Sequence, residues 1–254
     1  MSDSAGITSS SARDARPTLA VVIPALNEEA AIGPVVAEVL IATRRDDLAA
    51  SVTGVYVVDN GSTDRTAEVA AAAGATVVPE PRRGYGRACL AGVLAAGEVD
   101  LIALMDGDGS DRPDELPLLL ASLLAGEADL VVGSRTLGSY EPGSLLPQQL
   151  VGNKVAAVML RLLYGIRVTD IGPFRVIRRA DLLRLGMREM TYGWSVEMIA
   201  RAGRAGLRVR EVPVTYRKRS AGESKVSGNL RASVRAGSRI IATILRCRRA
   251  SSRS

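Results

Sequence analysis

Two carboxylates one residue apart, Asp106 and Asp108, follow the apolar run at residues 101–105 and are the first candidates for chemistry in this chain. Strand side chains repeat every second residue, so both carboxylates are expected on the same side of the chain. Carboxylates this close repel each other, and a hard divalent cation shared with a phosphate would relieve the repulsion. The alternative interpretation is an acidic turn that ends a strand. The rest of the chain must show whether a phosphate-bearing ligand accompanies the pair.

Composition narrows the possible chemistry. The 254 residues include no histidine, so a general base must be Asp or Glu and a metal must be held mainly by oxygen. Cys89 and Cys247 match no metal-binding spacing, which favours a reduced, cytoplasmic setting. The chain has 33 Lys and Arg against 27 Asp and Glu, with the excess mostly after residue 160, which indicates an anionic partner. Nucleic acid is disfavoured because the basic segment has almost no aromatic residues.

Short apolar runs alternate with helical segments and must position these carboxylates. Strands are expected at residues 19–23, 54–58, 75–78, 101–105, 129–135, 174–177 and 207–214, and a helix is expected to open at Gly33 and Pro34. The alternation predicts an α/β fold, a parallel sheet with helices on both faces. Ligands of such sheets bind beyond the carboxyl ends of the strands. One cleft should therefore collect the polar residues at those ends, namely Asn27, Glu28, Asp59, Asn60, Asp106, Asp108 and Arg135.

The two ends of the chain differ from this pattern. Residues 1–17 are rich in Ser and Ala, predict a flexible tail and do not resemble a signal peptide. A last helix is expected at residues 227–248, with Arg231, Arg235 and Arg239 on one face that could lie on anionic lipid. No apolar run reaches the roughly eighteen residues that a spanning helix needs.

Five motifs in order give the chain a resemblance to a known family. They are Val-Ile-Pro-Ala-Leu-Asn-Glu-Glu29, Val-Val-Asp-Asn-Gly-Ser-Thr-Asp64, Asp106-Gly-Asp108, Gly-Ser-Arg135 and the basic segment that ends in Glu-Ser-Lys225. Together they resemble the inverting glycosyltransferases of family two, in the branch of the dolichyl- and polyprenyl-phosphate mannosyltransferases. The resemblance covers about residues 18–228 and is specific because the motifs occur in register.

The resemblance implies a GT-A fold, a Rossmann-like and mostly parallel sheet sandwiched by helices, in residues 18–216. A basic loop and a basic amphipathic C-terminal helix would occupy residues 217–254. It also implies a nucleoside-diphosphate sugar as donor and Mg²⁺ or Mn²⁺ as cofactor. UDP and GDP both remain open as the nucleotide, as does the identity of the hexose.

The resemblance assigns roles to individual residues. The metal would be bound by Asp106, Asp108 and Ser110. Phosphate groups would be contacted by Arg135, Arg217, Lys218 and Lys225. The nucleotide would be bound by Pro24, Leu26, Asn27, Glu28, Asp59, Asn60 and Gly84, the last in a glycine-rich loop before a helix.

Two acceptors are compatible with this donor chemistry. A polyprenyl phosphate, the favoured one, is already an anion and needs no general base. The protein would then be a cytoplasmic enzyme lying peripherally on the inner face of the membrane. A soluble or glycan alcohol would need a carboxylate to take its proton, and Glu197 or Asp170 would be that base. The catalytic set is accordingly Asp106, Asp108, Arg135, Glu197 and Asp170.

Two other classes of protein are considered. Asp106-Gly-Asp-Gly-Ser110 after an apolar strand also resembles the first motif of haloacid-dehalogenase-type phosphatases, with Asp106 as nucleophile. Such enzymes carry the motif near the start of the catalytic domain, whereas three predicted strands precede it here. The other class is a nucleotide-sugar-binding module without turnover. The sequence leaves the oligomeric state open.

Overall fold

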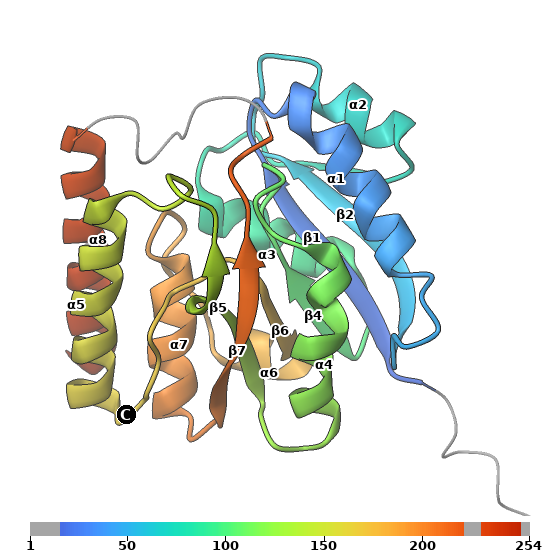
Figure 1. Ribbon diagram of the computed structural model, residues 1–254. Helices are drawn as coiled ribbons and strands as arrows, with labels where there is room; N and C mark the ends of the chain where they lie inside the picture. The colour runs from blue at the N-terminus through green and yellow to red at the C-terminus, as the bar shows by residue number, and fades with distance from the viewer. Residues whose placement is uncertain (1–15, 221–229, 250–254) are drawn as a thin grey trace, which may run out of the picture.

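The computed structural model describes residues 16–220 and 230–249, and one seven-stranded sheet forms its centre (Figure 1). The strand order is β3-β2-β1-β4-β6-β5-β7. β6 runs antiparallel to both neighbours, and every other pair is parallel. The expected mostly parallel α/β sheet is confirmed. The strands are β1 (Thr18–Ala25), β2 (Ser51–Asp59), β3 (Thr76–Pro79), β4 (Leu101–Leu104), β5 (Leu130–Tyr140), β6 (Arg175–Arg178) and β7 (Val209–Tyr216).

Helices cover both faces of the sheet. α1, α2 and α4 pack on one face, and α3, α5, α6, α7 and α8 contribute to the core on the other. The helices are α1 (Glu29–Ala42), α2 (Thr66–Ala72), α3 (Tyr85–Ala95), α4 (Leu116–Leu124), α5 (Pro147–Tyr164), α6 (Arg179–Arg184), α7 (Trp194–Arg204) and α8 (Leu230–Arg249), with a 3₁₀ turn, η1, at Pro113–Glu115.

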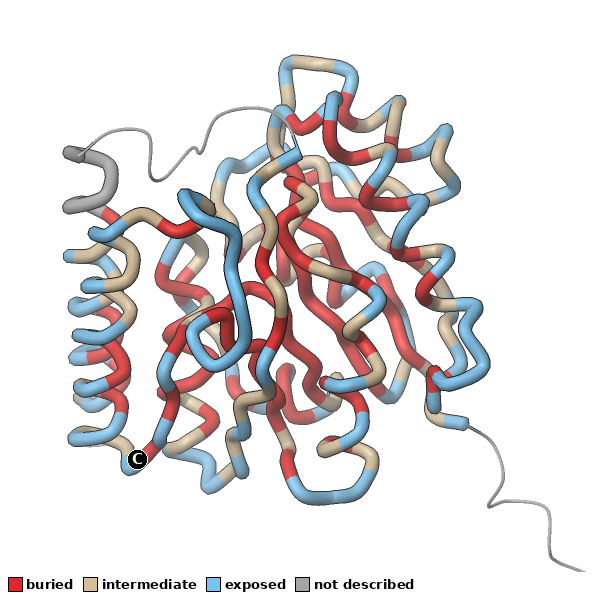
Figure 2. The backbone as a smooth tube through the Cα atoms, viewed as in Figure 1, coloured by how far each residue is buried: buried red, intermediate tan, exposed pale blue. Residues whose placement is uncertain are grey.

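The central strand β1 shows how the sequence divides between these layers. Leu19, Val21 and Ile23 face the layer of α1, α2 and α4, whereas Ala20 and Val22 face the opposite core. Because both faces are covered, β1 is apolar without polar alternation, as buried parallel strands are. Figure 2 shows the buried residues concentrated between the two layers. The rigid sheet leaves the loops at its carboxyl edge to carry the site.

α1 begins earlier than the sequence predicts. The helix starts at Glu29 rather than at Gly33, and Pro34 lies inside it, where it forgoes one backbone hydrogen bond. Its start is held by the beginning of α2 and the residues before it, because Asp64 accepts a hydrogen bond from the Glu29 N–H at 3.2 Å and Thr66 Oγ1 accepts from the Glu28 N–H at 2.8 Å. Such contacts between distant segments leave no local sequence pattern.

α8 packs against α5 and α7 through polar as well as apolar contacts. The Tyr164 hydroxyl donates to the Ile244 carbonyl, and the buried carboxylate of Glu189 accepts from Arg239 and Arg246. Of the three arginines expected on one face, Arg239 thus has a carboxylate partner while its side chain stays about half exposed, and the side chains of Arg231 and Arg235 lie outside those described. Within residues 16–220 and 230–249, no helix combines the length and the apolar character required to cross a bilayer.

Candidate active site

The acidic pair lies just beyond the carboxyl end of β4, near the middle of the sheet. The backbone N–H of Asp106 donates to Asp111 Oδ2 at 3.0 Å, and Asp106 Oδ1 is buried without a hydrogen-bond partner in the described part of the chain. Asp108 is buried, and its Oδ1 accepts from the Ser110 N–H at 2.9 Å. Ser110 Oγ is likewise buried and unpartnered among the described residues. Two oxygens here thus lack the partners that buried polar atoms normally have.

Crowding of negative charge perturbs these carboxyl groups. Burial, and then the nearby charge of Asp108, raise the pKa of Asp106 to about 7, although a hydrogen bond from Tyr85 and the charges of Arg135 and Arg219 oppose the rise. Burial and the charge of Asp106 also raise the pKa of Asp111 well above its usual value. A bound cation would stabilise the ionised forms of these groups.

The donor set fits Mg²⁺ or Mn²⁺. Hard cations take oxygen ligands, and Asp106 Oδ1 and Ser110 Oγ are oxygens still lacking a partner. Within the described residues, no group of three or more His, Cys, Asp and Glu side chains is arranged to hold a metal by itself. The chain therefore offers part of a coordination shell, which suits a cation that keeps water and phosphate oxygens as further ligands.

The loop after β7 covers the acidic pair. Arg219 donates from Nη1 to Asp108 Oδ2 and from Nη2 to Glu28 Oε1, both at 2.7 Å. The loop backbone is fastened as well, because the Ser220 N–H donates to the Asp108 carbonyl at 3.1 Å and the Arg217 N–H donates to the Ser110 carbonyl at 2.8 Å. A basic segment more than a hundred residues away in sequence thus closes over the carboxylates.

Gly109 makes this closure possible. Its φ of +78° is unfavourable for residues with a Cβ, and a Cβ there would lie 2.5 Å from Ser220 Oγ. The glycine after the acidic pair is therefore required both by the turn and by the approach of the covering loop.

Arg135 forms a buried ion pair with Asp170. Its Nε and Nη2 donate to the two carboxylate oxygens at 2.6 and 2.8 Å, and Asn153 Nδ2 donates to Asp170 Oδ1 at 2.5 Å. Burial alone would raise the pKa of Asp170, but the hydrogen bond and charge of Arg135 lower it below the usual value. The guanidinium carbon also lies 4.9 Å from the centroid of the Tyr216 ring. Arg135 is consequently held in one orientation.

Other predicted nucleotide contacts lie in the loops that follow β1 and β2. Asn27 has a left-handed backbone with φ of 50°, and its Oδ1 accepts from the Thr63 N–H at 2.8 Å. Asp59 is half-buried at the end of β2, where its Oδ1 accepts from the Ser62 N–H at 3.1 Å. Pro24 is buried within β1, and Leu26 is half-buried after it. The structure joins the β1 and β2 loops, as the common strand edge predicts.

The side chain of Asn60 binds backbone groups of the glycine-rich loop, including the N–H of Gly84. The Asn60 amide donates to the carbonyls of Glu80 and Arg82, both at 2.9 Å, and its Oδ1 accepts from the Gly84 N–H at 2.7 Å. A Cβ on Gly84 would lie 2.3 Å from the Met190 carbonyl oxygen. The side chain of Asn60 is therefore occupied in folding the glycine-rich loop, and the structure does not favour it as a base contact.

Glu197, in the first turn of α7, makes its hydrogen bonds to the segment before that helix and to the next turn. Its carboxylate accepts from the N–H groups of Arg188 and Glu189 at 2.9 and 2.7 Å and from Arg201 Nε at 2.7 Å. It lines a hollow of about 190 Å³ beside α8. These contacts fasten the loop before α7, and the structure does not bring Glu197 to the site as a base.

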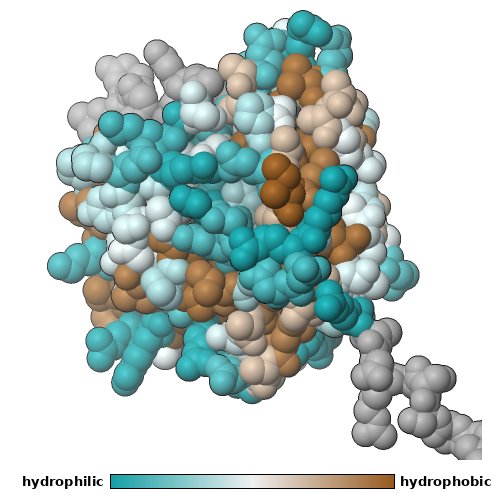
Figure 3. Space-filling model, turned by 45° about the vertical axis from the view of Figure 1, so that its right-hand side comes forward, coloured by the Kyte–Doolittle hydropathy of each residue, from teal (hydrophilic) through white to brown (hydrophobic). Residues whose placement is uncertain are grey.

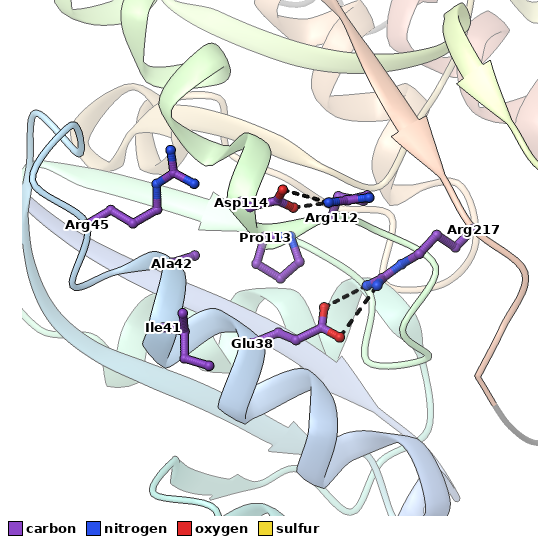
Figure 4. A pocket seen from close by; sticks show the side chains of 8 residues that line it. All are labelled: Glu38, Ile41, Ala42, Arg45, Arg112, Pro113, Asp114 and Arg217. Carbon is purple, nitrogen blue, oxygen red and sulfur yellow. Dashed lines mark hydrogen bonds and ion pairs between the residues drawn. The ribbon is translucent and has the colours of Figure 1, made fainter.

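Arg217 lines a charged groove of about 310 Å³ between α1, η1 and the loop after β7 (Figure 4). Its Nη2 donates to Glu38 Oε2 at 2.7 Å, and across the groove Arg112 pairs with Asp114. Figure 3, turned to bring this side of the molecule forward, shows a broad hydrophilic band. Lys218 is exposed nearby, and Lys225 lies outside the described residues.

Three residues of the site were not predicted. Arg219 was only one of several cations in a basic segment, and its selection depends on how the loop folds back. Tyr85 reaches the acidic pair from the start of α3, and Asp111 reaches it from the turn that follows Asp108. The sequence signal for Asp111 was its position five residues after Asp106, which alone does not distinguish a partner from a surface acid.

A largely buried acidic pair at the end of a central strand, under a cationic loop of a mostly parallel sheet, is the arrangement of GT-A enzymes. The chain belongs to Glycosyl transferase family 2, whose family profile matches residues 20–186. It is a glycosyltransferase, and the resemblance to the polyprenyl-phosphate branch is confirmed by its relatives. The alternative of a phosphatase with Asp106 as nucleophile is wrong, because the matched family and its relatives are glycosyltransferases.

Similar proteins include glycosyltransferases named for different acceptors. An uncharacterized glycosyltransferase of Mycobacterium tuberculosis is 44% identical over 216 residues, covering 84% of this chain and 92% of that protein. The undecaprenyl-phosphate mannosyltransferase of Micrococcus luteus is 35% identical, covering 69% and 76%. Among solved structures, glucosyl-3-phosphoglycerate synthase of M. tuberculosis with Mn²⁺, UDP and glucosyl-3-phosphoglycerate has a TM-score of 0.71 at 26% identity, covering 91% of this chain and 80% of that one.

Proposed function

We propose that this enzyme transfers a hexose from a UDP- or GDP-linked donor to a polyprenyl phosphate, with inversion at the sugar. The observation that carries the proposal is the pair Asp106 and Asp108, with an unpartnered Asp106 oxygen, beneath a cationic loop. The relative from M. luteus named for undecaprenyl phosphate supports the acceptor. The structural neighbour with Mn²⁺ and UDP supports the nucleotide and the cofactor.

Mg²⁺ or Mn²⁺ held by Asp106, Asp108 and Ser110 would stabilise the charge that develops on the leaving diphosphate. The loops after β1 and β2 would bind base and ribose, with Asn27, Glu28 and Asp59 as contacts. Closure of the loop after β7 would exclude water and so limit hydrolysis of the donor.

Cationic side chains would bind the phosphates. Arg135 bonds Asp170 through Nε and Nη2, so its Nη1 could donate to a phosphate oxygen. Arg219 would exchange its carboxylate partners for phosphate oxygens when the donor and cation enter. Arg217, Lys218 and Lys225 would add positive charge at the rim.

The state of the carboxylates favours a phosphate acceptor over an alcohol. A phosphate oxygen is already anionic and needs no base. An alcohol requires a carboxylate that is free to take its proton, for which Glu197 and Asp170 are the two candidates. Asp170 has a lowered pKa and is occupied by Arg135, and Glu197 is bound to the loop before α7.

A transfer assay tests the proposal. The protein is incubated with Mn²⁺, each of a set of UDP- and GDP-hexoses, and either a polyprenyl phosphate or the matching polyprenol. We expect product only with the phosphate, and Asp108→Asn should abolish it. Product formed from polyprenol alone would overturn the proposed phosphate acceptor. Binding of the donor without product from either acceptor would overturn the proposed transfer and indicate a nucleotide-sugar-binding module.

A further inference from the structure

Exposed apolar side chains lie along α5 and on the neighbouring helix α8. On α5, Val151, Val155, Val158 and Leu162 recur at intervals of four, three and four residues, and their exposed fractions range from 43% to 77%. That spacing places them in one stripe along the helix. On α8, Ile241 and Leu245 are 39% and 44% exposed. We call these six side chains the α5–α8 outer face.

The two helices form one surface layer. They lie side by side at one edge of the molecule, joined by the Tyr164 hydroxyl and the Ile244 carbonyl (Figure 1). Their opposite sides supply the core, through Ala156, Ala157 and Leu160 of α5 and Ile244 of α8. The outer face points away from that core, and its six side chains remain 39% to 77% exposed. Apolar surface of this extent marks a site of interaction.

The charge around the outer face has one sign. Lys154, Arg161 and Arg248 are exposed on the same two helices and have no carboxylate partner among the described residues. Neither α5 nor α8 contains an acidic residue. An apolar stripe flanked by cations fits the interfacial region of a bilayer with anionic lipids.

We propose that the α5–α8 outer face docks the enzyme on an anionic membrane surface, with its six apolar side chains inserted among the lipids. A second copy of the chain fits less well, because two such faces would bring cations against cations. This assigns the contact to α5 and one edge of α8 rather than to the arginines that bind Glu189. The proposal builds on the proposed function, in which the acceptor is a membrane lipid.

α5 lies between the outer face and the ion pair of Arg135 and Asp170. Asn153, on the inner side of the same helix, bonds the Asp170 carboxylate that holds Arg135. A helix is about 10 Å across, so the outer face lies about one helix diameter from this ion pair. A phosphate at the lipid headgroup level would thus be within a short distance of Arg135.

Vesicle flotation with the full chain tests the docking. The variant Val158→Glu/Leu162→Glu places two negative charges on the outer face. The control Leu94→Glu/Leu118→Glu adds the same charges to exposed leucines of α3 and α4. We expect wild type and control to float with phosphatidylglycerol-containing vesicles, and binding by the outer-face variant to fall about tenfold or more. Equal binding by wild type and the outer-face variant, or no wild-type binding, would overturn the proposal.

Two further measurements separate the alternatives. Light scattering that shows a wild-type dimer dissociated by Val158→Glu/Leu162→Glu would assign the face to a second copy and overturn lipid docking. Transfer to a short, water-soluble prenyl phosphate should be retained by this variant, whereas transfer to a long-chain acceptor in vesicles should fall. Wild type that binds vesicles but transfers to neither acceptor would refute the proposed function and leave the docking supported.

Discussion

Arg219 reaches back from the loop after β7 to the carboxylate of Asp108, and its guanidinium also binds Glu28. The arginine thus supplies the positive charge that the acidic pair needs and competes with a divalent cation for Asp108. Burial would lower the pKa of Arg219, but the charges of Asp108 and Glu28 raise it above its usual value. The guanidinium stays charged at any working pH, so only displacement can free Asp108.

We expect Arg219→Gln to separate metal binding from catalysis. Removal of the competing cation should tighten Mn²⁺ binding in the absence of donor, on the order of tenfold, the scale of one charge-assisted hydrogen bond. Transfer should nevertheless fall, because a phosphate-binding cation is lost. Titration calorimetry with Mn²⁺, alongside kcat and KM for the donor, measures both effects. Arg82→Gln, which removes an exposed cation bound to Glu80, is the matched control. Weaker Mn²⁺ binding by Arg219→Gln would contradict the competition.

Stability of the metal-free protein should depend on pH through Asp106. Its pKa of about 7 lies above the unfolded value of about 3.9, so the folded state holds its proton more tightly. The resulting stabilisation is fully present below about pH 4 and is lost as the pH rises through 7. Asp106→Asn should flatten this loss, which we put on the order of 2 kcal/mol after allowance for solvent and relaxation. Urea unfolding at several pH values measures it.

Added Mn²⁺ provides the second arm of that experiment. The cation should restore the stability of wild type at pH 7 to 8, because it stabilises the ionised carboxylates. It should not stabilise Asp106→Asn to the same extent. The account would be contradicted if the free energy of unfolding changed by the same amount between pH 4 and 7 in wild type and in Asp106→Asn.

The site was predictable where it depends on strand ends, and less so where it depends on loops. Asp106 and Asp108 follow β4 and Asp59 ends β2, and parallel strands must bring their carboxyl ends to one edge. Arg135 lies within β5, just after the regular pairing with β7 stops at Ser134. Arg219 is placed by the path of the loop after β7, which no local pattern specifies.

Two further contacts also lie outside what local patterns specify. Asn60 follows a strand too, but its amide is used by the backbone of residues 80–84. Helical periodicity alone placed Arg231, Arg235 and Arg239 of α8 on one face. Glu189, from a loop far away in sequence, binds two arginines of that helix, and such a partner cannot be found by periodicity.

Glu189 should control how firmly α8 is attached. Burial would raise its pKa, but hydrogen bonds from Thr191, Arg239 and Arg246 hold the pKa at about 2. Its stabilisation is therefore present above the unfolded pKa of about 4.3 and is lost as the pH falls towards 2. Glu189→Gln should cost about 1 to 2 kcal/mol, since the two arginines are half exposed and regain water.

Limited proteolysis at neutral pH measures that attachment. Cleavage within α8 should be faster in Glu189→Gln than in wild type. Glu98→Gln is the control, because Glu98 is almost fully exposed and pairs with Arg179 at the surface. Identical cleavage rates in Glu189→Gln and wild type would show that apolar packing alone holds α8.

Glu197→Gln distinguishes a structural carboxylate from a base. Loss of a general base lowers the rate by about 10² to 10⁴ and removes the corresponding limb of the pH profile. Because Glu197 accepts bonds from Arg188, Glu189 and Arg201, we expect instead a lower thermal midpoint with kcat within about threefold of wild type and an unchanged pH profile. Transfer to polyprenyl phosphate, measured from pH 5 to 9 below the unfolding temperature, provides the readout. Both N–H groups donate to Oε2, so the isosteric amide can keep its oxygen there and loses only the acceptor for Arg201 Nε. The fold should therefore persist. A rate that collapses while the fold is intact would restore Glu197 as the base and with it the alcohol acceptor.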